Sequence, residues 1–154
     1  MILPPYRIAA STIPGAGQGL FLAAPVARGR VVVAPDDIRG TWRWEEVRRR
    51  PDAEAAMAAS VRWFEDQCTV SLDWPDECFV NHSFEPNGLW HLGFIFAARD
   101  LAEGEELTVD YRHLLPEGER EVFDDAATGR EIVGLSWAES LAISSRALVA
   151  LQGG

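Results

Sequence analysis

The segment Asn81-His82-Ser83-Phe84-Glu85-Pro86-Asn87 holds both asparagines of a 154-residue chain. All 14 basic residues are arginine and none is lysine, a bias typical of a coding sequence rich in G and C, since lysine is normally among the commonest residues. The same bias depletes asparagine and tyrosine, so the few that remain are candidates for a specific chemical role. We therefore take this segment as the first place to look for a functional site.

The overall composition is that of one globular domain. A mass of 17.0 kDa fits a single domain, and 47% hydrophobic residues can build a core. The formal net charge of -10 repels phosphates and anionic lipids, which argues against nucleic acid and membrane surfaces as partners. The two cysteines lack a Cys-x-x-Cys spacing and indicate neither a disulfide framework nor a zinc cage. The apolar runs are too short to span a membrane and the first residues do not resemble a secretory signal, so we expect a cytoplasmic protein.

The pattern of apolar residues and turn formers predicts a mainly β protein with some α, an α+β fold. Residues 2–33 contain short apolar runs broken by Gly and Pro, as expected for strands joined by tight turns. Residues 92–98 form a nearly continuous apolar run, which predicts a buried strand. Residues 107–111 alternate between apolar and polar, as a strand should.

Helices are expected in two places. Residues 41–67 mix apolar residues with Glu and Arg and contain no Gly, which predicts one or two helices interrupted at Pro51. Residues after Pro116 are acidic and are predicted to form a loop. Ser136 and Glu139 then form a Ser-x-x-Glu capping box, and the apolar residues that follow at helical spacing predict an amphipathic C-terminal helix.

Three segments gain meaning from their order and spacing. They are Gly17-Gln18-Gly19-Leu20-Phe21, Phe79 to Asn87, and Ala98 to Tyr111. A lone Gly-x-Gly is a weak signal, but all three together fit one small domain. Together they resemble the SET-domain family of protein lysine methyltransferases, and most of all its small free-standing bacterial members. The resemblance covers roughly Ile13 to Tyr111 and is weakest from Asp36 to Trp74.

The resemblance implies a fold, an activity and a cofactor. The fold would be a single domain over residues 1–154, made of several small sheets, a helical insert at about 41–67 and a C-terminal helix, with the core at about 13–111 and its last strand threaded near Asn81. The activity would be transfer of a methyl group from S-adenosylmethionine to the side-chain amine of a protein lysine. The residues implied at the cofactor site are Gly17, Gln18, Gly19, Asn81, His82 and Tyr111.

These residue types also have physical reasons to be in such a site. Gly17 and Gly19 let the backbone approach a ligand closely, although a plain β-turn would use them too. Asn81 can both donate and accept, which suits the ammonium and carboxylate end of an amino-acid-like ligand. His82 can hold an adenine edge through its backbone or ring. A turn asparagine beside a buried histidine is the alternative explanation.

Tyr111 is the catalytic residue that the resemblance implies, although a tyrosine packed in the core at a strand end is the alternative. In-line methyl transfer needs a neutral amine, and neutralising lysine at pH 7 costs ~4.6 kcal/mol. A sulfonium ~4 Å away contributes roughly 4 kcal/mol of repulsion at an effective dielectric of 20. Tyr111 therefore need not be a strong base, and its hydroxyl can instead orient the amine and the methyl group.

The acidic composition indicates a basic, lysine-containing protein or peptide as the substrate. Carboxylates at the rim of the site would steer such a peptide, whereas carboxylates inside the channel would hold the lysine charged and oppose reaction. An ordinary solvated face is the alternative explanation for each of these carboxylates. The rim candidates are Glu103, Glu105, Glu106, Asp124 and Asp125.

Three residues depart from the family pattern. Cys78 stands where the family often has Arg, Phe84 replaces a Cys, and Val109 takes the place of an aromatic residue that governs how many methyl groups are added. Cysteine-rich flanking modules are absent, so no structural zinc is expected. Residues 112–154, here called the closing segment, must then close the substrate channel. The candidates for its aromatic wall are Phe123 and Trp137.

Two other functions fit the sequence less well. A peptide-binding module could keep this fold without turnover, but intact Tyr111, Asn81 and His82 favour an enzyme. A metal-dependent hydrolase could use His82, His91 and His113 with nearby carboxylates. The spacings of nine and 22 residues between these histidines fit no short helical ligand pair.

Overall fold

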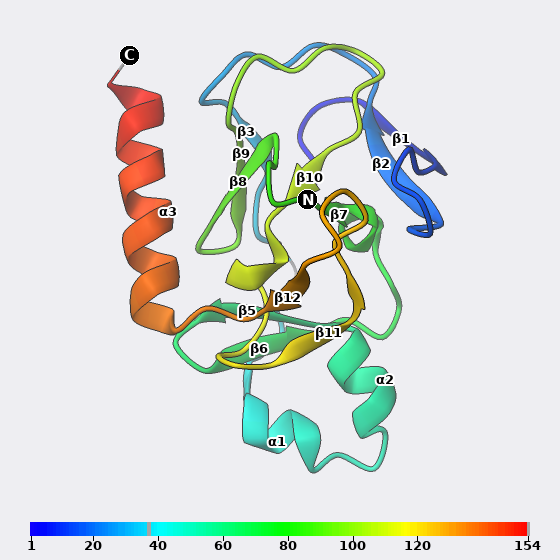
Figure 1. Ribbon diagram of the computed structural model, residues 1–154, viewed down its shortest axis with the longest axis vertical. Helices are drawn as coiled ribbons and strands as arrows, with labels where there is room; N and C mark the ends of the chain where they lie inside the picture. The colour runs from blue at the N-terminus through cyan, green and yellow to red at the C-terminus, as the bar shows by residue number, and fades with distance from the viewer. Residues whose placement is uncertain (37, 154) are drawn as a thin grey trace.

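The computed structural model describes residues 1–36 and 38–153. Over these residues the chain forms small sheets and short helices, with one longer helix along the side of the molecule (Figure 1). In chain order the elements are β1 (Tyr6–Ala10), β2 (Gln18–Leu22), β3 (Val31–Val33), β4 (Trp42–Arg43), α1 (Trp44–Arg48), α2 (Ala53–Ala58), β5 (Ser60–Phe64), β6 (Gln67–Val70), η1 (Asp76–Phe79), β7 (Asn81–His82), β8 (Gly88–His91), β9 (Phe94–Ala97), β10 (Thr108–Val109), η2 (Tyr111–His113), β11 (Arg120–Asp124), β12 (Glu131–Val133) and α3 (Trp137–Gln152).

The strands of the described residues pair into five small sheets. Two have three strands, in the orders β3-β9-β8 and β4-β6-β5, and two are the hairpins β1–β2 and β11–β12. The fifth is a parallel pair of two-residue strands, β7 and β10, which places Asn81 beside Thr108 and His82 beside Val109. The predicted α+β fold is confirmed, and so is the expectation that the last strand of the core threads near Asn81.

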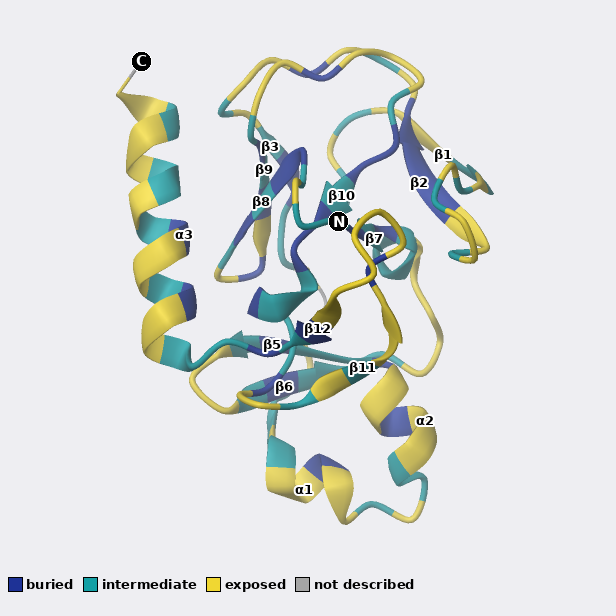
Figure 2. Cartoon of the chain, in the orientation of Figure 1, coloured by how far each residue is buried: buried dark blue, intermediate teal, exposed yellow. Residues whose placement is uncertain are grey.

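One apolar core joins the sheets around the β7–β10 pair. Leu107 and Val109 are fully buried while Thr108 between them is only partly buried, so the predicted alternation is confirmed there. Figure 2 shows the buried residues concentrated in these central strands and the outer side of α3 exposed. Burial of each large aliphatic side chain contributes roughly 1.5 to 3 kcal/mol. The core members are Leu20, Leu22, Val26, Val32, Val33, Val80, Trp90, Ile95, Ala97, Leu101, Leu107 and Val109.

The helical insert is shorter than predicted. Helices α1 and α2 flank Pro51 as expected, but the second ends at Ala58, and residues 60–70 form the β5–β6 hairpin. The prediction of helix as far as residue 67 is therefore wrong. The β-branched and aromatic side chains of β5 favour a strand, and Trp63 packs edge-on against Trp90 of the central sheet at 5.8 Å. Arg62 alternates with them and is buried on the other side of the strand.

Two further predictions about strands need correction. The run 92–98 is not one strand, because Leu92 and Gly93 have φ values of 51 and 85 and form the turn between β8 and β9. The residues after Pro116 are not simply a loop, since they contain the β11–β12 hairpin. Strand β11 escaped prediction because its side chains are mostly exposed, including a fully solvated Val122, so it shows no burial pattern.

The C-terminal helix begins as predicted. The hydroxyl oxygen of Ser136 accepts from the backbone N–H of Glu139 at 3.2 Å, and the Glu139 carboxylate accepts from the Ser136 N–H at 3.2 Å. The two fully buried residues of α3 are serines, not leucines: Oγ of Ser140 lies 2.8 Å from Nδ1 of a core histidine and Oγ of Ser144 lies 2.9 Å from another. Among the described residues, no helix is both long enough and apolar enough to cross a membrane.

Candidate active site

Asn87 holds the central segments of the site in register. Its buried side chain donates to the carbonyl of Glu106 at 2.8 Å and accepts from the N–H of Thr108 at 2.8 Å. These two bonds pin the stretch before Tyr111 to the end of the segment that opens with Asn81. Both ends of the Asn81–Asn87 segment are thus tied to residues 106–109.

The two glycines of the Gly-x-Gly motif are needed for different reasons. Gly17 has a φ of +73 in the loop before β2, with open space where a side chain would be. Gly19 lies within β2 in an ordinary extended conformation, but a Cβ there would lie 2.8 Å from Cδ of Glu106, nearer still to its Oε1, and 3.2 Å from Nδ2 of Asn81. The structure therefore brings Gly19 and Asn81 together around the Glu106 carboxylate.

Asn81 is anchored through its amide nitrogen. Nδ2 donates to the backbone oxygen of Gln18 and to Oε1 of Glu106, both at 2.9 Å, and lies 3.3 Å from Oγ of Ser11. The predicted site residues Gln18, Gly19 and Asn81 thus meet at one point. The side chain of Gln18 is exposed and only its carbonyl takes part.

Glu106 is the residue at this point that sequence reasoning misplaced. It was expected at the solvent rim, but it is 8% exposed. Its Oε1 also accepts from Oγ of Ser11 at 2.6 Å, and its Oε2 accepts from the N–H of Thr12 at 2.8 Å and its hydroxyl at 2.5 Å. Burial pushes the pKa of Glu106 upward, but these bonds outweigh burial, so the pKa lies below its ordinary value. The group is an ionised carboxylate inside the protein.

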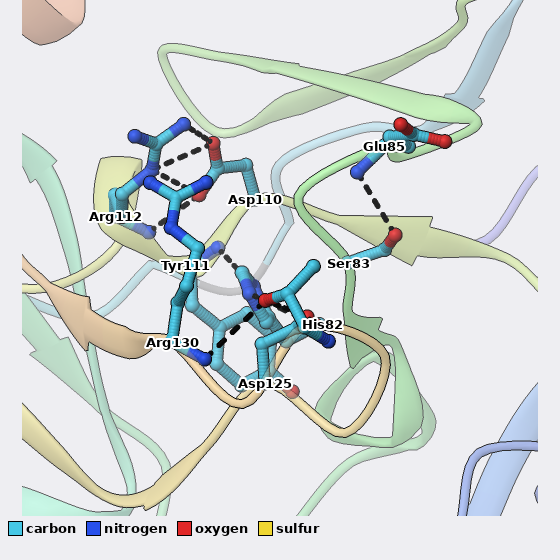
Figure 3. Close-up of polar contacts among 9 residues, drawn as sticks. His82, Ser83, Glu85, Asp110, Tyr111, Arg112, Asp125 and Arg130 are labelled. Atoms are coloured by element: carbon cyan, nitrogen blue, oxygen red, sulfur yellow. Dashed lines mark hydrogen bonds and ion pairs between the residues drawn. The ribbon is translucent and has the colours of Figure 1, made fainter.

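The His82 ring serves Tyr111. Its Nδ1 accepts the backbone N–H of Tyr111 at 3.1 Å, and its buried Nε2 faces Oδ1 of Asp125 at 3.7 Å (Figure 3). Burial lowers the pKa of His82, so the ring is neutral with its proton on Nε2. The expectation that this ring could hold an adenine edge does not fit these contacts, because both nitrogens face inward. Only the backbone of His82 remains for that role.

Tyr111 opens the turn η2 directly after the β7–β10 pair. Its hydroxyl donates to the backbone oxygen of Val80 at 2.8 Å. Burial raises the pKa of Tyr111 well above its ordinary value, and the nearby Glu121 and Cys78 raise it further. The hydroxyl is therefore neutral at any physiological pH, which agrees with the expectation that Tyr111 is not a strong base.

The sequence pattern of the SET domain matches residues 17–112, which is more than half of the chain. The chain belongs to the SET-domain family. A search of curated proteins for similar sequences gave no match. Members of this family are generally methyltransferases that use S-adenosylmethionine, so this SET domain falls in the protein lysine methyltransferase superfamily. The matched range contains every residue predicted for cofactor binding and catalysis, and the individual roles of these residues stay predictions.

The SET domain holds its closing segment on Phe84. Cζ of Arg112 lies 4.9 Å from the centroid of the Phe84 ring. Cζ of Arg130, from the β11–β12 hairpin, lies 4.5 Å from the same centroid. Asp110 forms an ion pair with Arg112 at 2.5 Å (Figure 3). Such cation–π contacts contribute ~0.5 to 2 kcal/mol each. Phe84, where the family pattern has Cys, therefore connects the hairpin to the core through packing.

The acidic residues of the SET domain divide into buried and surface groups. Asp125, expected at the rim, is 5% exposed, because it bonds its own turn at Thr128 and faces the His82 ring. Glu105 is at the surface but forms an ion pair with Arg99, and that hydrogen bond lowers the pKa of Glu105 to about 2. Asp124 pairs with Arg120 at 3.0 Å. Glu103 and Asp124 are exposed and Glu105 is half-buried, and their place at the rim of a substrate channel stays a prediction.

Phe123 is the aromatic residue of the closing segment that contacts Tyr111. Its ring lies edge-on to that of Tyr111, with centroids 6.5 Å apart, and it is 48% exposed. Trp137 instead lines a hollow with Arg62 and Pro116. Of the two residues predicted for the aromatic wall of the substrate channel, Phe123 is therefore the one that lies beside Tyr111. Glu121, two residues earlier on the same strand, was not singled out by the sequence, because one more carboxylate in an acidic stretch carries no signal.

The three histidines of the SET domain make different contacts. His82 contacts Tyr111, whereas His91 and His113 contact Ser144 and Ser140 of α3. Among residues 1–36 and 38–153, no group of three or more His, Cys, Asp or Glu side chains is arranged to bind a metal ion. The hydrolase hypothesis therefore gains no support from the geometry.

Proposed function

We propose that this SET domain is an S-adenosylmethionine-dependent protein lysine methyltransferase. The observation that carries the proposal is the state of Tyr111, whose neutral hydroxyl donates its own proton to the Val80 carbonyl. The lone pairs of that oxygen are then left for a partner on its other side, as the methyl hydrogens and amine of the reacting groups require.

The residues at the proposed cofactor site fit an amino-acid-like ligand. S-Adenosylmethionine supplies an activated methyl group on a positively charged sulfur. The Asn81 side chain is partly buried beside Gly19, where a Cβ would overlap the neighbouring carboxylate, so this corner is built around a close backbone. The residues that would hold the cofactor are Gly17, Gln18, Gly19, Asn81 and the backbone of His82.

Two residues near Tyr111 suit a lysine side chain. Phe123 offers an apolar edge, and Glu121 of the same strand lies near enough to Tyr111 to raise the pKa of that tyrosine, after the larger effect of burial. Burial raises the pKa of Glu121, so this carboxylate tolerates a proton better than an exposed one. The net charge of -10 supports a basic, lysine-containing peptide or protein as the substrate.

Transfer of labelled methyl groups tests the proposal. The SET domain is incubated with methyl-labelled S-adenosylmethionine and basic lysine peptides at pH 8 to 9, where more of the amine is neutral. Because the chain contains no lysine, label on lysine comes only from the substrate. Label on peptide lysine that is lost in Tyr111→Phe supports the proposal. Binding of cofactor and peptides without transfer would assign the chain to the silent module instead.

A further inference from the structure

We propose that Glu106 is a positioning residue that fixes the Asn81 carboxamide, so that only its oxygen is offered to the cofactor and the site selects a ligand ammonium group. This inference rests on the proposed function and identifies the part of the cofactor that Asn81 reads. Glu106 was considered for a rim role by sequence reasoning, and the structure suggests this different one.

The orientation of the Asn81 amide follows from its neighbours. The two closest partners of Nδ2 are the Gln18 carbonyl and the Glu106 carboxylate, and both groups can only accept hydrogen bonds. An amide oxygen in this position would face two acceptors, so the nitrogen must be there. Both hydrogens of Nδ2 are then committed inside the protein.

The remaining atom, Oδ1 of Asn81, has no hydrogen-bond partner among the residues that the structure describes. An amide held in this way can act toward a ligand only as an acceptor. In an amino-acid-like cofactor the matching donor is the α-ammonium group, since the carboxylate needs donors. Asn81 was expected to bind both the ammonium and the carboxylate of the cofactor, and its anchoring restricts it to the ammonium.

The charge of Glu106 points to the same ligand group. Its hydrogen-bond donors are the neutral groups of Ser11, Thr12 and Asn81, and no ion pair joins it to a cation in the described part of the chain. A buried carboxylate without a countercharge is costly for a fold to keep. An arriving ammonium group supplies the missing positive charge. The four hydrogen bonds already made by Glu106 occupy its oxygens, so the ammonium binds to Asn81 and not to Glu106.

A purely structural role makes a different prediction. If Glu106 only fastens the Ser11–Thr12 loop to the core, its loss weakens every ligand of the site equally. If it orients Asn81, its loss weakens only ligands that carry the ammonium group. Three adenosine ligands separate these cases: S-adenosylmethionine, its demethylated product S-adenosylhomocysteine, and 5′-methylthioadenosine, which lacks the amino-acid end.

Calorimetric titration of Glu106→Gln with these ligands is the test. The glutamine keeps the size of the side chain but places an NH2 group near Asn81, which allows the amide to turn over. We expect the affinity for the two amino-acid ligands to fall at least 10-fold and that for 5′-methylthioadenosine to change less than 3-fold. Glu54→Gln is the matched control, because Glu54 is an exposed carboxylate on α2, outside the candidate site, and it should leave all three affinities unchanged.

A second substitution separates the role of Asn81 from that of the loop. In an Asn81→Ala background the carboxamide is absent, so adding Glu106→Gln should change the affinity for both amino-acid ligands less than 3-fold. Equal losses for all three ligands, or a further loss above 3-fold in the Asn81→Ala background, would overturn the inference while leaving the proposed function intact. Failure of the wild type to bind S-adenosylmethionine would instead remove the proposed function.

A measurement on the wild type covers the case that these variants do not fold. The chain has only five side-chain amides, on Asn81, Asn87, Gln18, Gln67 and Gln152, so their NMR signals can be assigned. The Asn81 amide protons should exchange slowly with solvent and stay protected when S-adenosylhomocysteine binds. Rapid exchange in the free protein would show that Glu106 does not hold them.

Discussion

Substitution of Gly19 by alanine should displace the Glu106 carboxylate and destabilise this part of the candidate site. A Cβ at this position lies 2.8 Å from Cδ of Glu106 and closer to its Oε1, so the carboxylate must shift by ~1 Å in a packed interior. Its hydrogen bonds are 2.5 to 2.9 Å long, and a shift of this size carries several of them beyond useful length.

The magnitude follows from the charge on Glu106. A hydrogen bond to a charged group contributes about 1.5 to 3 kcal/mol, so losing two lowers the free energy of unfolding by ~3 to 6 kcal/mol. In a chain of this size each 1 kcal/mol shifts the melting temperature by roughly 2 to 4 °C. Gly19→Ala should therefore lower the melting temperature by about 10 °C and abolish stabilisation by S-adenosylmethionine.

Gly17→Ala is the matched control. Its positive φ costs an alanine ~1 to 2 kcal/mol, but no neighbour lies within 4 Å of the new methyl group, so the melting temperature should fall by only a few degrees. In a Glu106→Ala background the clash disappears, and Gly19→Ala should then cost less than ~1 kcal/mol. Calorimetry on the four variants measures this. A loss in Gly19→Ala no larger than in Gly17→Ala, or one that persists without Glu106, would refute the steric explanation.

Three other outcomes are expected. Tyr111→Phe should lower methyl transfer ~100-fold, equivalent to about 2.7 kcal/mol of barrier, while titration shows a nearly unchanged cofactor affinity. The variant should also lose ~1 kcal/mol of stability, because the Val80 carbonyl loses its hydrogen-bond partner. Full activity would exclude a catalytic role. Burial raises the pKa of Glu121 in the folded protein, so ionising this carboxyl destabilises the fold. The destabilisation is absent below the unfolded pKa and grows as pH rises through the folded pKa, so Glu121→Gln should raise the melting temperature at pH 7 and not at pH 4. Equal effects at both pH values would contradict this. Phe84→Ala removes the ring beneath two arginines and should speed proteolysis within residues 120–133 at least 10-fold, and unchanged cleavage would show that the hairpin has another anchor.

The parts of the fold that sequence predicted correctly depend on local or motif-level signals. The capping box at Ser136 and Glu139 is complete within four residues, and the alternation of residues 107–109 reflects burial on one side of a strand. The pairing of Asn81 with Thr108 was expected only from the resemblance, because nothing in the two segments alone specifies a parallel contact across 27 positions.

The errors have a common cause in tertiary contacts. Strand β5 follows an alanine-rich helix without a Gly or Pro, and its strand conformation depends on the Trp63 contact with a distant sheet. Glu106 and Asp125 look like any other acidic residue in an acidic chain. Their burial depends on donors from segments ~95 residues away in the first case and on a facing histidine in the second.

The two serine contacts fix both the rotation and the lengthwise position of α3 against the rest of the molecule. Leucines alone would allow a helix to rotate or slide along a smooth apolar surface at little cost. Ser140 and Ser144 are one turn apart, and each meets its own histidine, so a slip of a single residue would break both bonds at once. His113 belongs to the same short turn as Tyr111, so the seating of the last helix also defines the position of the tyrosine on which the proposed chemistry depends.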